Sequence, residues 1–205
     1  MKEYSQYVLV LHASVAATTL KEFVAAAKAR PGGFNYASAG VGSPLHLASE
    51  LFQKRADIKM AHIAYKGGGP AAASVLGGET QVLFGSVASS LPHVKTGRLK
   101  ALATTGAKRA KVTPDLPTIA EQGYACFETD SWYGIVAPAS LPRDVVAKMN
   151  AEFNRALNDP AMRATLVERG LEPLGGTSEQ FATHIRNEIA KYAQIVKAAN
   201  IRIEN

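Results

Sequence analysis

The stretch that decides the fold is Phe34-Asn35-Tyr36-Ala37-Ser38-Ala39-Gly40-Val41-Gly42-Ser43-Pro44-Leu45-His46. It is typical of a buried strand, then a loop of small residues, then the start of a helix. Ser43 is a suitable N-cap, and Pro44 suits the first helical position because its missing N–H costs nothing there. Free N–H groups beside Gly40 and Gly42 would meet the positive end of the helix dipole, which predicts a site for a carboxylate. The alternative is a turn that binds nothing, because Gly-x-Gly with a capping serine is a weak motif.

The composition is that of a globular protein. The chain has 205 residues, which is enough for one large domain or two small ones. Hydrophobic residues make up 47% and charged residues 20%, so the sequence is not of the disordered class. The net charge is +6, but Lys and Arg are scattered, and residues 108–111 form the single tight cluster. This pattern argues against a nucleic-acid partner, whereas a mild positive field suits acidic small molecules.

Cysteine and histidine usage gives no sign of a metal centre. Cys126 is the single cysteine, so no intrachain disulfide can form, and its apolar neighbours predict a small buried side chain. The histidines lack zinc-binding spacing, and we expect neither a metal nor a cofactor.

No apolar run reaches the roughly 18 residues of a membrane span. Met1 leads into an apolar strand without a signal peptide, so either the protein is cytoplasmic or this is not the natural start.

The first half of the chain alternates between strand and helix patterns. Strands are predicted at residues 7–11, 34–39, 59–65, 81–86 and 99–105, with helices at 44–56, 71–76 and 89–95 and a further helix from residue 20. This alternation indicates a parallel sheet covered on both faces. Ligands of such sheets bind at the carboxyl ends of the strands, where residues 38–43, 65–69 and 85–86 fall.

The second half is unbalanced. A long strand is predicted at residues 127–138, and a short helix is predicted from Thr118. Beyond Pro138 nearly every segment reads as a helix with one apolar face, and such helices need a surface to pack against. Either these helices cover the sheet of the first half, or they belong to a second domain whose strands are absent from this chain.

Several short motifs in this order resemble the Bug family, the extracytoplasmic solute receptors of tripartite tricarboxylate transporters, which are related to type II periplasmic binding proteins. The resemblance runs from about Tyr7 to the end. It rests on Leu20-Lys21-Glu22-Phe23, Asn35-Tyr36-Ala37-Ser38-Ala39-Gly40, His46-Leu47-Ala48, His62-Ile63-Ala64-Tyr65-Lys66-Gly67, Leu91-Pro92-His93-Val94-Lys95, Leu99-Lys100-Ala101-Leu102-Ala103, Leu116-Pro117-Thr118-Ile119-Ala120-Glu121 and Trp132-Tyr133-Gly134.

The resemblance implies an α/β fold of the type II periplasmic-binding-protein kind. One complete parallel-sheet lobe would span residues 13–130. Residues 1–12 and 131–205 would supply crossing strands and the C-terminal helices of a second, incomplete lobe. The N-terminal part of the family is missing, so the chain looks like a fragment. It would be a periplasmic receptor, not an enzyme, that takes di- or tricarboxylates or amino acids and delivers them to membrane permease subunits. Its exposed lobe surface would favour a homodimer.

Ligand-binding residues are carried over by position. The loop after the second strand would hold a carboxylate, and the loop after the third would wall the cleft. Gly85-Ser86 stands where many relatives place an aspartate–asparagine pair, which leaves the orientation of the ligand open. The set is Ser38, Ala39, Gly40, Val41, Gly42, Ser43, His46, Tyr65, Lys66, Gly67, Gly85, Ser86 and Asp130.

Some of these residues have plainer interpretations. His46 either steadies an anion or packs in the core, and His62 in its strand favours the core. Asp130 either orients the hinge, faces the cleft or is a surface carboxylate. Trp132 and Tyr133 are expected to pack at the lobe junction.

Two other functions stay open at the level of the sequence. One is a cytoplasmic α/β enzyme that acts on an anionic metabolite with His46 or His62 as a base. The absence of a Gly-x-Ser-x-Gly elbow and of a phosphate loop argues against it. The other is a truncated dimerisation module that binds no ligand, in which the helices after Pro138 cover the sheet of another chain.

Overall fold

The structure is a computed structural model that describes residues 3–125, 127–198 and 201. The prediction for Cys126 lies outside the described residues. In chain order the elements are β1 (Glu3–His12), α1 (Leu20–Ala29), β2 (Asn35–Ser38), α2 (Pro44–Ala56), β3 (Ala61–Ala64), α3 (Gly68–Leu76), β4 (Val82–Ser86), α4 (Val87–Lys95), β5 (Leu99–Thr104), β6 (Asp130–Tyr133), α5 (Arg143–Asn158), α6 (Pro160–Glu168), β7 (Glu172–Pro173) and α7 (Ser178–Ala198).

The main sheet has the strand order β3-β2-β4-β1-β5. β2 runs parallel to β3 and to β4, as the alternating pattern predicts. β1, however, pairs antiparallel with both β4 and β5, so the sheet is mixed and the expectation of an all-parallel sheet is wrong. β1 enters the sheet from the opposite end and lies between two strands that are parallel to each other.

β1 is a central strand with both faces buried, which explains its continuous apolar run. Leu9 and Leu11 lie in one core with residues of α1 and α2, including Phe23 and Phe52. Val8 and Val10 point to the other face, in a second core with residues of α3 and α4. Alternation along one extended strand therefore joins both helical layers to the sheet.

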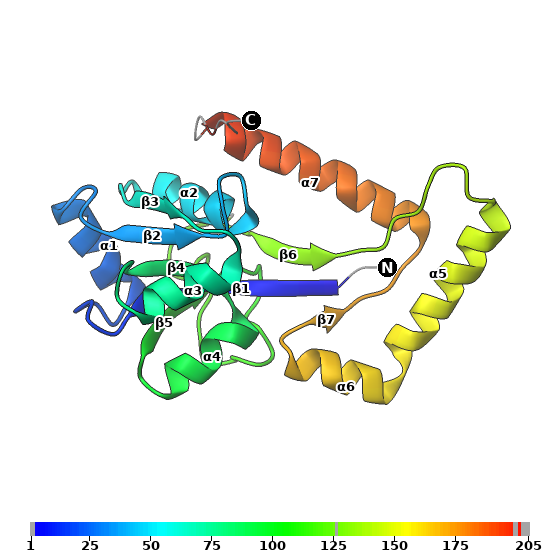
Figure 1. Ribbon diagram of the computed structural model, residues 1–205, viewed down its shortest axis with the longest axis horizontal. Helices are drawn as coiled ribbons and strands as arrows, with labels where there is room; N and C mark the ends of the chain where they lie inside the picture. Colours follow the sequence, from blue (N-terminus) through cyan, green and yellow to red (C-terminus); the bar gives the residue numbers. More distant parts are fainter. Residues whose placement is uncertain (1–2, 126, 199–200, 202–205) are drawn as a thin grey trace.

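The same strand continues beyond the sheet into a second group of elements. Residues 3–6 of β1 pair antiparallel with β6, and residues 3–4 pair with β7. Figure 1 shows β1 in the middle of the molecule, with its N-terminal end on the side of β6, β7, α5 and α6. From there α7 returns to contact α2. β1 and β6 thus link two parts of the chain.

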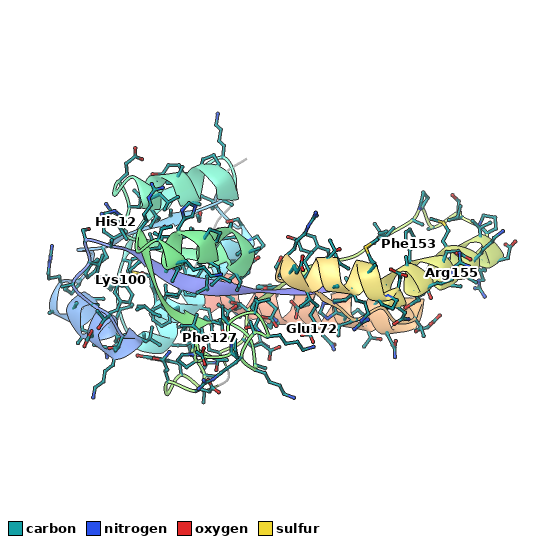
Figure 2. The ribbon with its side chains drawn as sticks, turned by 90° about the horizontal axis from the view of Figure 1, so that it is seen from below. His12, Lys100, Phe127, Phe153, Arg155 and Glu172 are labelled. Atoms are coloured by element: carbon teal, nitrogen blue, oxygen red, sulfur yellow. The ribbon has the colours of Figure 1, made fainter. Side chains whose placement is uncertain are left out.

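The helices after Pro138 cover little of the sheet. In Figure 2, Phe153 and Arg155 on α5 lie far to one side of His12 and Lys100, which belong to the α/β layers. α5 has a strongly amphipathic sequence, yet Leu157 is its one buried residue. These helices therefore do not form a layer over the main sheet, and their assignment to a second domain stays a prediction. No described helix combines the length and the hydropathy needed to cross a membrane.

The predicted Ser43 cap of α2 is confirmed, and side chains also cap α1 and α6. Thr19 and Glu22 form a reciprocal capping box at α1, and the Ser43 hydroxyl accepts the His46 N–H at α2, where Pro44 is the first residue. Asp159 caps α6 by accepting the Met162 N–H at 2.9 Å.

Two element predictions are wrong. The long strand at residues 127–138 shrinks to β6, because β1 offers it only four partner residues, and residues 133–140 are exposed. The segment from Thr118 is a turn. Thr118 and Glu121 exchange capping bonds there, but Gly123 (φ +100°) ends the segment before a helix forms. The two-residue strand β7 was not predicted, because so short a segment carries no periodicity.

Candidate ligand-binding site

The carboxyl ends of β2, β3 and β4 lie side by side at one edge of the main sheet, as parallel neighbours must. The loop of residues 39–43 follows β2, residues 65–67 follow β3, and Ser86 ends β4. The Tyr65 N–H donates to the Ser38 carbonyl at 3.0 Å, which ties the first two loops together. The structure therefore gathers the predicted loops at a single edge, on the side from which β1 enters.

The loop of residues 39–43 has little free backbone. Gly40 (φ +125°) and Gly42 (φ +75°) adopt conformations that favour glycine. The Gly40 N–H donates to the Ser38 hydroxyl at 3.1 Å, the Gly42 N–H to His46 Nδ1 at 3.0 Å, and the Ser43 N–H to the Gly40 carbonyl at 3.1 Å. The prediction that these glycines leave bare amides is wrong, because the fold's own acceptors reach them.

Two amides of this segment are still available to a ligand. In the described part of the chain, the N–H groups of Val41 and Leu45 donate to no protein acceptor. Val41 is the most exposed residue of the loop, and Leu45 lies in the first turn of α2, where the helix dipole favours negative charge. A carboxylate here would therefore meet two amides and a helix N-terminus, a smaller set of donors than the sequence suggested.

Ser38 is fully buried and its hydroxyl is engaged by the fold. Its Oγ lies 2.6 Å from His62 Nε2, accepts the Gly40 N–H, and lies 3.1 Å from the Gly40 carbonyl oxygen. This side chain shapes the loop from behind. Its place among the ligand contacts stays a prediction.

His46 and His62 are stacked. Their ring centroids are 4.0 Å apart and the ring planes differ by 7°, and the Tyr36 ring lies 4.8 Å from that of His62. The Tyr36 phenol donates to Glu50 Oε1 at 2.5 Å, and His46 Nε2 lies 3.9 Å from the same oxygen. His46 packs in a buried cluster, as one of its two interpretations predicts, and its action on an anion stays a prediction.

Burial sets the charge of this cluster. It lowers the pKa of His46, although Glu50 acts in the opposite direction. Burial, and then the neighbouring His46, lower the pKa of His62 to about 4. The pKa of the Tyr36 phenol is raised by burial and by its hydrogen bond to Glu50. Both rings are therefore neutral at pH 7, which suits hydrogen bonding better than direct capture of an anion.

The loop after β3 packs against the first loop. A Cβ on Gly40 would lie 3.6 Å from the Tyr65 carbonyl, and the Tyr65 phenol donates to Glu79 at 3.3 Å. Gly67 (φ +115°) is the N-cap of α3 and offers no side chain there. Lys66 is exposed. Tyr65 thus borders the first loop, and the role of Tyr65, Lys66 and Gly67 as a wall of the cleft stays a prediction.

Gly85 and Ser86 form the end of β4. A Cβ on Gly85 would collide with the Ser90 hydroxyl and lie 3.3 Å from Leu83 Cδ2, so this backbone leaves no room for an aspartate. The Ser86 hydroxyl caps α4 by accepting the Ser89 N–H at 3.2 Å. Ser86 is half-buried at the edge, one strand away from the loop of residues 39–43.

Asp130 lies apart from that loop, at the start of β6 and directly opposite Gln6 of β1. It lines a hollow of about 210 Å³ between residues 107–112 and 167–172. Its Oδ1 atom is buried with no hydrogen-bond partner in the described structure. Burial and the nearby Glu128 raise the pKa of this carboxyl to about 7, against an opposing effect of Lys191. Asp130 is therefore not a freely exposed surface carboxylate, and its role at a hinge stays a prediction.

Tyr36, Glu50 and Gln53 were not predicted as site residues from the sequence. Gln53 Nε2 donates to Glu50 Oε1 at 2.7 Å and its Oε1 accepts the Met60 N–H at 2.6 Å, so it holds Glu50 toward the two aromatic rings. The spacing of His46, Glu50 and Gln53 along one helix face was a usable signal. The described residues contain no group of three or more His, Cys, Asp or Glu arranged to hold a metal ion.

These features define an α/β protein with a loop-lined sheet edge beside a strand shared by two groups of elements, an architecture of the solute-binding-protein class. The chain belongs to the TctC family, the tripartite tricarboxylate transporter family receptor, whose model matches residues 1–201. The expectation drawn from the sequence motifs is thereby confirmed.

Relatives and solved structures are similar along nearly the whole chain. Protein BugT of Bordetella pertussis is 32% identical over 197 residues, which cover 96% of this chain and 60% of BugT. A UPF0065 protein of Pseudomonas sp. strain P51 is 34% identical over 190 residues, 92% of this chain and 56% of that protein. The chain thus spans little more than half the length of these curated relatives.

Two similar solved structures hold a bound dicarboxylate. An R. palustris protein solved with adipate superposes with a TM-score of 0.90 at 30% identity, over 97% of this chain and 66% of that one. MatC of Rhodopseudomonas palustris, with bound malate, gives a TM-score of 0.82 at 26% identity, over 95% and 67% of the two chains. The type II periplasmic-binding-protein fold is confirmed by these likenesses.

Proposed function

We propose that this chain is the ligand-binding part of a receptor for small carboxylates, with residues 38–45 and 65–67 and Gly85-Ser86 at the contact surface and His46 directly behind it. The observation that carries this proposal is the TctC family match across residues 1–201. It is supported by the adipate and malate held by two structural neighbours. Residues 13–130 would form the ligand-holding lobe, and β1 and β6 would act as the crossings, with Asp130 at the hinge.

The free amides fit this class of ligand. A carboxylate accepts hydrogen bonds from backbone N–H groups at a helix N-terminus, which the Val41 and Leu45 amides provide. The neutral His46 and His62 add no charge of their own. The net charge of +6 favours the approach of an anion without fixing its identity. Dicarboxylates and tricarboxylates are therefore the first ligands to test, with amino acids next.

Compartment and partners follow from the family description. We propose that the chain acts in the periplasm and hands its ligand to the membrane permease subunits of a tripartite transporter. It would bind without chemical conversion. Incubation with adipate or malate, followed by analysis of the ligand, checks this point, since any product would favour an enzyme.

A matched pair of glycine variants tests the site. Adipate and malate should raise the melting temperature of the wild type and bind in calorimetry with one ligand per chain. Gly40→Val should weaken binding at least about tenfold because its side chain strains the φ +125° loop against Tyr65. Gly123→Val is the control, since it carries a similar strain (φ +100°) in a turn remote from β2. Equal loss in both variants, or no binding by the wild type, would refute the proposal.

Self-association is a further proposal about partners. A groove along the extended segment before α5 and the facing sides of α5 and α7 is lined by Ile135, Val136, Met149, Phe153 and Ile185. Val136 is 77% exposed, and contiguous apolar surface of this kind favours contact with a second copy. The chain would then form a homodimer through this surface.

A further inference from the structure

The rings of Tyr36, His46 and His62 join three elements of the fold behind the loop of residues 39–43. Tyr36 and His62 are register partners on the parallel strands β2 and β3. His46 comes from the first turn of α2, and its ring lies 4.0 Å from that of His62 and 6.2 Å from that of Tyr36. The three planes differ by less than 20°. The loop that follows β2 thus rests on a near-parallel aromatic cluster.

Each histidine fixes one glycine amide of the loop. His46 does so directly, because its Nδ1 accepts the Gly42 N–H at 3.0 Å and therefore carries no proton. His62 does so through Ser38, whose Oγ lies 2.6 Å from His62 Nε2 and accepts the Gly40 N–H at 3.1 Å. With both glycine amides turned inward, the loop leaves the amides of Val41 and Leu45 for another acceptor.

We propose that His46 and His62 are positioning residues that hold the loop of residues 39–43 in its ligand-binding shape, and that the loop keeps this shape only while the His46 ring is neutral. The inference rests on the proposed carboxylate-binding function, because the loop is the surface on which the ligand would bind. Neither ring touches the ligand in this scheme. Protonation of His46 weakens binding through the backbone of the loop.

The chemistry of the rings explains why protonation weakens ligand binding. A proton on His46 Nδ1 would face the Gly42 N–H, so two donors would meet and the hydrogen bond would break. Glu50 of α2 and the Tyr36 phenol of β2 are the other titratable groups against these rings, and the phenol already donates to Glu50. A charge on one ring also disfavours a charge on the other across 4.0 Å.

The pH range follows from the burial of the rings. The pKa of His46 is lowered by burial, and the pKa of His62 is lowered to about 4 by burial and by His46. Both rings therefore stay neutral at pH 7 and take up protons as the pH falls from about 6.5 toward about 4. Ligand affinity is full above this range and declines within it.

Variants of His46 separate the hydrogen bond from the ring. His46→Asn places an amide oxygen near the position of Nδ1, so it keeps an acceptor for the Gly42 N–H but does not titrate. His46→Phe keeps the ring and loses the acceptor. His93→Gln on α4 is the matched control, because it removes a histidine outside the cluster. Adipate is the probe, and calorimetry at pH 7.5 and pH 5 is the measurement.

At pH 7.5 we expect His46→Asn to bind adipate within about threefold of the wild type, and His46→Phe to bind about tenfold more weakly. Between pH 7.5 and pH 5 the wild type and His93→Gln should lose more affinity than His46→Asn, because only these two proteins carry a ring at position 46 that takes up a proton. Protonation of adipate itself is common to all variants and cancels in this comparison. An identical pH dependence in the wild type and His46→Asn would overturn the inference, as would wild-type affinity in His46→Phe.

A measurement without ligand separates this inference from the proposed function. Imidazole and amide NMR of the unliganded wild type should show His46 as the Nε2–H tautomer, with the Gly42 amide signal titrating together with its ring. A wild type that binds neither adipate nor malate at pH 7.5 would refute the proposed function alone. The positioning role fails if His46 is the Nδ1–H tautomer, or if the Gly42 amide does not follow its titration.

Discussion

Asp130 combines burial with a carboxyl group that has no partner for one of its oxygens among the described residues. Its pKa is raised to about 7 by burial and by Glu128. In the unfolded chain the same group titrates near 3.9. The folded state therefore binds its proton more tightly, and the favourable contribution is complete below about pH 4 and is lost as the pH rises through about 7.

This pH dependence predicts how the variant Asp130→Asn changes stability. At pH 8 it should be more stable than the wild type by about 1–3 kcal/mol, a range reduced from the full shift because the side chain is partly hydrated. At pH 4 the two proteins should unfold at the same urea concentration. Asp115→Asn, on an exposed turn, should track the wild type at both values. A difference between Asp130→Asn and the wild type that is equal at pH 4 and pH 8 would contradict the assignment.

Single residues were predictable where their role is local. Ser43 and Thr19 act as caps because the chain itself brings the N–H group to the hydroxyl. The fate of the Gly42 amide was not predictable, since its acceptor is one nitrogen of the His46 ring, whose rotamer depends on packing against His62. Gly85 was predicted to lie at the site, but the reason for a glycine there, the Ser90 hydroxyl, exists only in the fold.

At the scale of elements, the presence of a helix or strand was easier to predict than its direction or its length. Helix α2 follows from its Ser43 cap and α5 from its apolar spacing, and both signals lie within the segment. The antiparallel direction of β1 depends on strands that come 70 to 95 residues later in the chain, so no local pattern records it. β6 is shorter than its apolar run because its length is set by the four residues of β1 that pair with it.

The attachment of α7 to β6 gives a prediction at this scale. Phe181 is 8% exposed and meets Trp132 edge-on, with ring centroids 5.7 Å apart. Phe181→Ala should cost about 3 kcal/mol, the lower end for such a truncation, because the site lies near the surface. Trp132 is the only tryptophan, so its fluorescence should shift to the red as water reaches the ring.

Ile189→Ala on the same helix is the control, since that side chain is 65% exposed and should change neither stability nor emission. Urea unfolding followed by tryptophan fluorescence measures both quantities together. If Phe181→Ala keeps the wild-type emission maximum, then Phe181 does not shield Trp132 and α7 is held to β6 by other contacts.

At the scale of the whole molecule, the imbalance between the two halves was visible in the sequence and is present in the structure. The helices after Pro138 carry apolar faces, and the described chain places few strands beneath them. The match to TctC relatives of greater length fits this arrangement. The sequence could not show how the two halves are joined. Residues of β1 pair with β4 in the main sheet and with β6 beyond it, so β1 belongs to both groups of strands.

An exposed groove is formed by the segment before α5 together with α5 and α7. This apolar groove favours self-association of the chain. Sedimentation velocity over a range of concentrations should show a monomer–dimer equilibrium. Val136→Glu and Met149→Glu should each raise the dissociation constant at least about tenfold, because each would place an unpaired charge in the apolar contact. Met162→Glu is the matched control, because this exposed methionine lies on α6 outside the groove and its variant should dimerise like the wild type. A wild type that sediments as a monomer at every concentration would exclude the homodimer, and equal effects of all three variants would locate the contact elsewhere.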